Sequence, residues 1–231
     1  MAAIPPFVGT AFGLVTALAV GVFCYAAPRS GRTLLVLLVW LLLQGALALS
    51  NFYTVTTGFP PRLPLLLLPP VALIAGLFFT VRGRVYLDGL RLPTLTLLHV
   101  VRVPVELVLL ALFQHRAIPQ LMTFEGRNWD ILAGLTAPLV YYLAFRRQWL
   151  GGKGLLAWNL LALGSLLNIV VNALLSAPSP LQRFAFDQPN VAILQFPFNW
   201  LPACVVPLVL LAHLAAIRQL LAPQVSLTAA Q

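Results

Sequence analysis

Three polar side chains interrupt a long apolar stretch near the middle of the chain: His99, Arg102 and Glu106. Their spacing, three residues and then four, places all three on one face if the stretch is helical. There the guanidinium could hold an anionic group, the carboxyl could exchange a proton, and the imidazole could serve as a base or a ligand. We therefore expect the chemistry of this protein to involve this stripe.

The composition identifies the surroundings of the stripe as a membrane. Of the 231 residues, 61% are hydrophobic and 8% are charged, and the mean hydropathy is +0.95, whereas soluble domains carry about 25% charged residues. This excludes soluble, disordered, fibrous and disulfide-stapled proteins. The net charge of +9 comes from basic residues that lie mostly at the ends of apolar runs, where topology selection and anionic lipid headgroups account for them. Membrane lipids, and not nucleic acid, are the expected partners.

The apolar runs predict an all-α, polytopic helix bundle that forms a single transmembrane domain over residues 1–231. They are rich in leucine and lack the alternating pattern of a membrane barrel. A spanning helix needs about 20 apolar residues, so seven of them with their loops use nearly the whole chain. The predicted spans cover residues 7–27, 33–57, 64–81, 93–115, 130–145, 155–176 and 193–221.

Lysine and arginine are distributed unequally between the two sides of this predicted bundle. The loops after the first, third and fifth spans and the C-terminus hold nine of them, whereas the N-terminus and the other loops hold four. The positive-inside rule then places the N-terminus outside and the C-terminus in the cytoplasm, with a bacterial-type cytoplasmic (inner) membrane as the expected location. The nine residues are Arg29, Arg32, Arg82, Arg84, Arg91, Arg146, Arg147, Lys153 and Arg218.

The charges of the stripe must face protein or water. An ionised side chain in the hydrocarbon interior costs about 2.5–3.5 kcal/mol on insertion scales, and Arg102 and Glu106 lie half-way along the fourth span. Pro104 lies between them and removes a backbone N–H, which predicts a kink and a free carbonyl at Val100. Two interpretations stay open: either the two charges neutralise each other as a packing contact, or at least one of them belongs to a functional site.

Asparagines on two later spans supply polar groups that match the stripe. Asn168 and Asn172 share one face of the sixth span, and Asn199 lies near the outer end of the seventh. Together with Glu106 they would line a cup that opens outward, with Arg102 and Glu106 at its floor. Ordinary interhelical hydrogen bonds, worth about 0.6 kcal/mol per pair on average, are the alternative role for each asparagine.

The predicted outer loop 116–129 contains the most polar aromatic segment of the chain. One interpretation makes this segment a lid over the cup, with Arg127 offering bidentate contacts to an anion. The other makes it a capped start of the fifth span. Asn128 or Asp130 would then accept hydrogen bonds from helix N–H groups, and Trp129 would lie in the aromatic belt.

The sequence leaves the cofactor undetermined. His99 and His213 fall at similar predicted depth on the fourth and seventh spans, and a facing pair of histidines could hold haem. With Glu106 they would give three metal ligands, but only if the helices bring all three together, and we predict no metal site. Retinal is excluded, because the one lysine of the chain, Lys153, lies in a loop.

The leading hypothesis is a protein that binds or transports a small anionic or lipophilic molecule in a polar pocket between the fourth, sixth and seventh spans. The first alternative is a membrane-embedded enzyme acting on a lipid or lipophilic substrate, with Glu106 or His99 as general acid or base. A bis-His haem protein and an assembly subunit without a pocket are further alternatives. Catalytic residues, ligand identity and oligomeric state stay open. The candidate ligand-binding residues are His99, Arg102, Glu106, Asn168, Asn172, Asn199 and Arg127.

Overall fold

The computed structural model describes residues 4–56 and 62–222, and within them the chain is all-α, without a strand. The fold class predicted from the apolar runs is therefore confirmed. The α-helices are α1 (Pro6–Ala26), α2 (Ser30–Leu49), α3 (Pro64–Phe79), α4 (Val81–Asp88), α5 (Leu92–Leu98), α6 (Arg102–Gln114), α7 (Asp130–Tyr141), α8 (Gly152–Ser176) and α9 (Val206–Leu221). Short 3₁₀ and π turns are η1 (Phe52–Thr54), η2 (His99–Val101), η3 (Gln120–Met122), η4 (Tyr142–Arg146), η5 (Ala192–Leu194) and η6 (Leu201–Val205).

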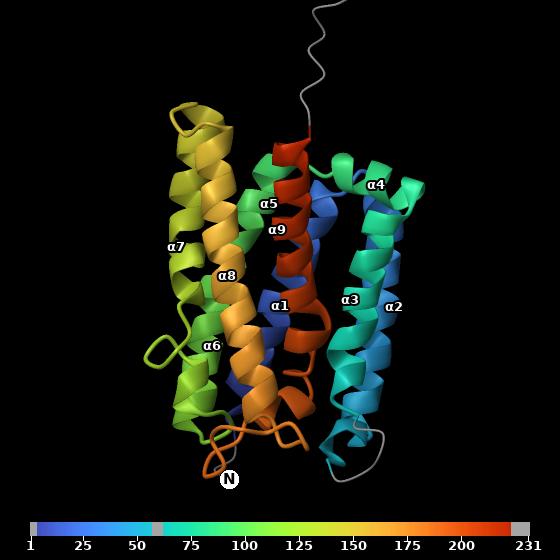
Figure 1. Cartoon of the computed structure of the whole chain (residues 1–231). Coiled ribbons are helices and arrows are strands. Elements are labelled where there is room, and N and C mark those ends of the chain that lie inside the picture. Colours follow the sequence, from blue (N-terminus) through green and yellow to red (C-terminus); the bar gives the residue numbers. More distant parts are fainter. Residues whose placement is uncertain (1–3, 57–61, 223–231) are drawn as a thin grey trace, which may run out of the picture.

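The long helices run back and forth along one axis and form an elongated bundle (Figure 1). α1, the continuous helix α5–α6, and α9 pack together at its centre. The hairpin of α2 and α3 lies on one side of them, and the hairpin of α7 and α8 lies on the other. Buried side chains such as Phe12, Leu98 and Leu208 form one large apolar core among the central helices.

Five helical stretches are long and apolar enough to cross a membrane: α1, α2, Leu92–Gln114, α8 and Leu201–Leu221. α3 and α4 meet at 94° and make a sixth if they are one broken span. α7 has 12 residues and is followed by a π turn of 5, and it is not among them. Length and apolarity thus support five or six spans, where the sequence predicted seven.

The arginine-containing segment 82–91, predicted as a loop, contains the helix α4. Thr80 caps it, because its Oγ1 accepts a hydrogen bond from the Gly83 N–H at 3.1 Å. Leu87 is fully buried while the arginines of the helix are exposed, and α4 lies across one end of the bundle (Figure 1). The loop prediction was wrong, since low hydropathy alone does not separate such a helix from a loop.

The predicted second and seventh spans are both shorter than expected. Asn51 adopts the left-handed conformation, with φ 57°, and turns the chain out of α2 into η1; Thr57, the predicted end, lies outside the described residues. At the other helix, residues 195–199 form turns, and regular structure begins with η6 at Leu201. Pro197 explains the late start, because a proline disfavours helical backbone at the residue before it.

The loop after α6 returns into the bundle, and this return positions the candidate site. Gln114, the last residue of α6, lies about 18 Å along the helix from Arg102 at a rise of 1.5 Å per residue. Yet Asp130, the first residue of α7, hydrogen-bonds Arg102. The chain between them therefore runs back along the bundle to the level of Arg102, with Ile118 and Thr123 fully buried. Irregular backbone is tolerated at that depth where protein surrounds it.

Pro104 does not break the central helix. The 3₁₀ turn η2 precedes it, and Leu92–Gln114 continues as one apolar stretch of 23 residues. The proline lies in the first turn of α6, where a missing N–H costs least. The predicted kink thus takes the form of a tightened turn at His99–Val101, next to the polar residues of the stripe.

Candidate functional site

Arg102 is bound by Asp130 and not by Glu106. Its Nε and Nη2 atoms donate to the two carboxylate oxygens of Asp130 at 3.0 and 2.8 Å, which makes a bidentate ion pair. Both residues are buried, with 3% and 5% of their surface exposed. The interpretation in which Arg102 and Glu106 neutralise each other was therefore wrong, and so was a purely capping role for Asp130.

Two more N–H groups of Arg102 have partners inside the protein. Nη2 donates to the Ala162 carbonyl oxygen at 3.1 Å, and Nη1 lies 3.3 Å from Nε2 of His213. Because a guanidinium only donates, His213 Nε2 accepts, and the ring proton must be on Nδ1. Nδ1 indeed lies 3.0 Å from the side-chain oxygen of Asn159. His213 is therefore held as a neutral imidazole in one tautomer between α6 and α8.

His99 stacks on His213 instead of sharing a ligand with it. The two ring centroids are 3.9 Å apart and the planes differ by 18°, while the Trp158 ring meets His99 edge-on at 5.4 Å. A haem iron between two histidines needs one nitrogen of each ring pointing at the metal, and stacked rings direct their nitrogens sideways. Both nitrogens of His213 are already used. The pair therefore does not fit the bis-His haem alternative.

Glu106 has a different partner, Asn128, from the returning loop. Asn128 Nδ2 donates to Glu106 Oε1 and also to the Met122 carbonyl oxygen at 3.0 Å. Asn128 Oδ1 accepts from the backbone N–H of Asp130 at 3.1 Å. The second carboxyl oxygen, Glu106 Oε2, is buried and has no hydrogen-bond partner among the described residues.

These contacts form one continuous row of buried hydrogen-bonded groups, which we call the polar chain. It crosses the bundle from α8 through α9 and α6 to the start of α7, and it ends at Glu106. Within the polar chain, the charges of Arg102 and Asp130 cancel each other. Glu106 itself has no cation within ion-pair distance in the described structure. The members are Asn159, His213, Arg102, Asp130, Asn128 and Glu106.

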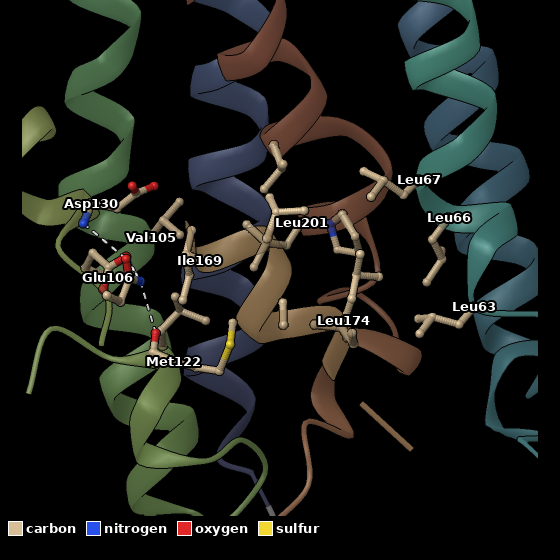
Figure 2. A pocket seen from close by; sticks show the side chains of 17 residues that line it. Leu63, Leu66, Leu67, Val105, Glu106, Met122, Asp130, Ile169, Leu174 and Leu201 are labelled. Atoms are coloured by element: carbon tan, nitrogen blue, oxygen red, sulfur yellow. Dashed lines mark hydrogen bonds between the residues drawn. The ribbon is translucent and has the colours of Figure 1, made fainter. Parts of the chain in front are cut away.

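A cavity of about 70 Å³ begins at this end of the polar chain; we call it the Glu106 cavity. Figure 2 shows its polar end, with Glu106 and Asp130, opposite the leucines Leu63, Leu66 and Leu67 that precede or begin α3. Apart from Glu106, Asn128 and Asp130, its walls are apolar side chains. It has room for a few water molecules or a short alkyl group. The described residues contain no group of three His, Cys, Asp or Glu side chains placed to hold a metal ion.

The predicted cup is not assembled as expected. Asn168 is exposed, and its Nδ2 donates to the Arg127 carbonyl oxygen at 2.8 Å, while Asn172 donates back to Asn168. The Arg127 guanidinium lies over the Phe184 ring at 5.5 Å. Asn168, Asn172 and Arg127 therefore connect the loop 116–129 to α8 and to the segment after α8 that contains Phe184. None of the three lines the Glu106 cavity.

Asn199 belongs to a different part of the molecule. Its Nδ2 donates to the Gln44 carbonyl oxygen on α2 at 2.9 Å, and the Gln44 side chain accepts from Tyr53 at 2.6 Å. Of the seven candidate residues, only Glu106 lines the cavity. Arg102 belongs to the polar chain, and His99 stacks on His213, another member of that chain.

Sequence reasoning missed Asp130, Asn128 and Asn159 as members of the site. A charge count could have found Asp130: the chain has five acidic residues, and a buried arginine needs one of them as a partner. Asn128 carries no comparable signal, because its role depends on the return of the loop. Asn159 lies one residue after Trp158 on α8, and its contact with His213 depends on how α8 and α9 face each other.

Comparison with known proteins identifies a family whose description assigns no activity. No curated protein and no solved structure matches the chain. A family whose description is "Domain of unknown function (DUF8737)" matches residues 60–221, which include α3 to α9, the polar chain and the Glu106 cavity. The chain therefore belongs to the DUF8737 family.

Proposed function

We propose that this protein is a multi-pass protein of a cell membrane, of the bacterial cytoplasmic type, that binds or carries a small lipophilic molecule in the Glu106 cavity. The five or six apolar helices support a location in the membrane. The unequal distribution of lysine and arginine supports an external N-terminus and a cytoplasmic C-terminus.

One observation carries the proposal: Glu106 Oε2 is a buried oxygen without a hydrogen-bond partner at the polar end of an otherwise apolar cavity. Buried polar atoms in native proteins are almost always satisfied by protein, water or ligand. A molecule with an apolar body and one donor group would satisfy this oxygen and fill the remaining space.

The charges around the cavity favour an amine or a hydroxyl over an anion. Four of the five N–H groups of the Arg102 guanidinium already donate hydrogen bonds inside the protein, so only one N–H of this guanidinium is left for an anionic ligand. Such a ligand would meet the carboxyl groups of Glu106 and Asp130. A donor on the ligand would complete the hydrogen bonding of Glu106.

The cavity volume favours a short apolar body, and a larger ligand requires α3 to move. α3 is suited to such movement, because only Leu66 and Ile74 of its residues are buried. The three leucines at its start form the wall opposite Glu106.

Three probes of equal chain length test the proposal: hexylamine, hexan-1-ol and hexanoate. With the protein in zwitterionic nanodiscs, we expect hexylamine and hexan-1-ol to raise the unfolding temperature and hexanoate to leave it unchanged. A ligand at 100 times its dissociation constant stabilises by about 2.7 kcal/mol. Glu106→Gln should lose most of the response to hexylamine, while the exposed control Glu125→Gln should keep it. Equal responses of the wild type and Glu106→Gln, or stabilisation by hexanoate, would contradict the proposal.

A further inference from the structure

A second, larger cavity of about 490 Å³ lies between α2, α3 and the central helices α1 and α9; we call it the hairpin groove. Its floor includes Phe23 of α1 and Leu208 of α9, and α3 lines it with residues other than those that line the Glu106 cavity. Val36 and Leu73, on its two sides, are 55% and 57% exposed. The groove therefore opens sideways toward the surroundings of the bundle, which in a membrane are acyl chains.

The groove is amphipathic along its length. Arg29 and Arg32 line it at the start of α2, next to the hydrogen bond between Thr33 and Tyr86 of 3.0 Å. Toward Trp40 the lining is apolar. The distance along α2 from Arg32 to Trp40 is about 12 Å at 1.5 Å per residue, so a cationic end and an apolar trough follow each other over part of an acyl chain's length.

The positive charge at this end is not neutralised by the protein. In residues 4–56 and 62–222, neither Arg29 nor Arg32 has a carboxylate within ion-pair distance. The acidic residue of the neighbouring helix α4, Asp88, is already bound by Arg218 through two hydrogen bonds of 2.8 and 2.9 Å. More arginines, Arg82 and Arg84, are exposed on α4. The partner that this surface fits is therefore anionic.

We propose that the hairpin groove binds an anionic phospholipid of the surrounding membrane. Its phosphate would lie at Arg29 and Arg32, where guanidinium groups make paired hydrogen bonds to phosphate oxygens, and one acyl chain would lie in the trough toward Trp40. A basic pocket between helices at the membrane surface is a known form of lipid-headgroup recognition. The proposal does not depend on the function proposed for the Glu106 cavity.

Trp40 provides the probe, because its side chain lines the groove. The full chain is placed in phosphatidylcholine nanodiscs that contain a small fraction of lipid with brominated acyl chains, either phosphatidylglycerol or phosphatidylcholine. Quenching of the Trp40 emission is obtained as the difference between the wild type and Trp40→Phe. Each arginine near a membrane surface contributes about five-fold in affinity for an anionic lipid, so two predict half-maximal quenching at a roughly 25-fold lower fraction of the brominated phosphatidylglycerol.

Matched variants separate the groove from general attraction to the membrane. Arg29→Gln/Arg32→Gln should abolish the preference for phosphatidylglycerol. Arg146→Gln/Arg147→Gln removes the same charge after α7, away from the groove, and should keep the preference. Leu73→Phe fills the groove from an exposed position and should weaken the quenching with both arginines in place. Equal quenching by the two lipids, an equal loss in the control pair, or no effect of Leu73→Phe would each overturn the proposal.

Discussion

The central helices and the α2–α3 hairpin differ in how deeply they are buried and in the polar contacts that connect them to the rest of the bundle. In the most apolar part of Leu92–Gln114, 61% of the residues are buried, and the corresponding value for Leu201–Leu221 is 56%, whereas it is 22% for α2. Of the central helices, α6 and α9 share the polar chain with α7 and α8. The hairpin shares with its neighbours a few side-chain hydrogen bonds, such as Trp40 Nε1 to the Ala203 carbonyl oxygen at 2.8 Å, and leaves the hairpin groove open beside them.

The membrane location proposed above accounts for this difference. In lipid, apolar surface gives helices little reason to associate, because acyl chains are as apolar as leucine, and association depends on close packing and polar contacts. Helices that carry buried polar groups must meet partners for those groups. On α2 Gln44 is such a group, whereas most leucines of this helix are exposed and are stable against lipid. The result is a bundle in which the central helices are more deeply buried than α2.

Breaking the ion pair of the polar chain should have the largest effect. Asp130→Ala leaves the buried guanidinium of Arg102 without its counter-charge, and we expect a loss of about 3–5 kcal/mol in the free energy of unfolding. Chemical unfolding in detergent, followed by tryptophan fluorescence, measures it. Asp187→Ala removes an exposed carboxylate and should change little.

A double variant sharpens this test. Replacing both members together, Arg102→Met with Asp130→Leu, removes the unpaired charge, and we expect much of the stability to return. If Asp130→Ala stays within about 1 kcal/mol of the wild type, as surface ion pairs do, the polar chain is not what fixes the central helices.

Removing a hydrogen bond between α2 and Trp200 should lower the free energy of unfolding by a smaller amount. Trp200 Nε1 donates to the Leu41 carbonyl oxygen on α2 at 3.0 Å, and Trp200→Phe removes this hydrogen bond while it keeps most of the ring. Interhelical hydrogen bonds in membrane proteins are worth about 0.6 kcal/mol on average and about 1.7 at most. The same unfolding measurement applies, with the exposed Trp149→Phe as control. A loss as large as that of Asp130→Ala would remove the contrast between the two regions.

The smallest effect concerns the ion pair between α4 and the end of α9. Hydrogen bonds from Arg218 lower the pKa of Asp88 below its ordinary value. A lowered pKa in the folded state means that the contact stabilises above the ordinary pKa of an aspartate, near 4, and that this contribution is lost as the pH falls through the folded value. Spin labels on α4 and α9 should therefore report a constant distance from pH 8 to about 5 and a longer one in stronger acid.

Asp88→Asn serves as the control for this titration. It removes the titrating group, so its label distance should be longer than that of the wild type and independent of pH. Because both side chains are partly exposed, solvent screens the pair, and we expect little change in overall stability. A wild-type distance that does not respond to acid would show that the pair does not hold α4.

The sequence predicted the helices better than their connections. α1, α3, α8 and the stretch Leu92–Gln114 begin and end within three residues of the predicted spans, because long apolar runs bounded by proline, glycine and arginine leave few alternatives. The failures are α4, the early end of α2, the turns around Pro197 and the return of the loop 116–129. In each of these segments the local composition suits several backbone paths, and packing selects one.

The burial of the polar stripe followed from the sequence, but the side chains that its members contact did not. Arg102, Glu106 and His99 are all buried inside the bundle, as the cost of charge in hydrocarbon requires. Their contacts with Asp130, Asn128 and His213 follow from helix rotation and from the loop, which no local pattern encodes. The asparagines predicted to orient a ligand form loop and interhelical hydrogen bonds instead.

By itself the sequence determined that this protein is a bundle of apolar helices, with its basic residues concentrated at one set of helix ends and with an arginine and a glutamate that must avoid lipid. Hydrophobicity and charge are properties of single residues, so they can be read without a fold. Only the tertiary structure decided that Asp130 neutralises Arg102 and that Glu106 is left at the edge of a cavity. Such pairings depend on segments far apart in the chain, and they are set by how the helices and the returning loop pack.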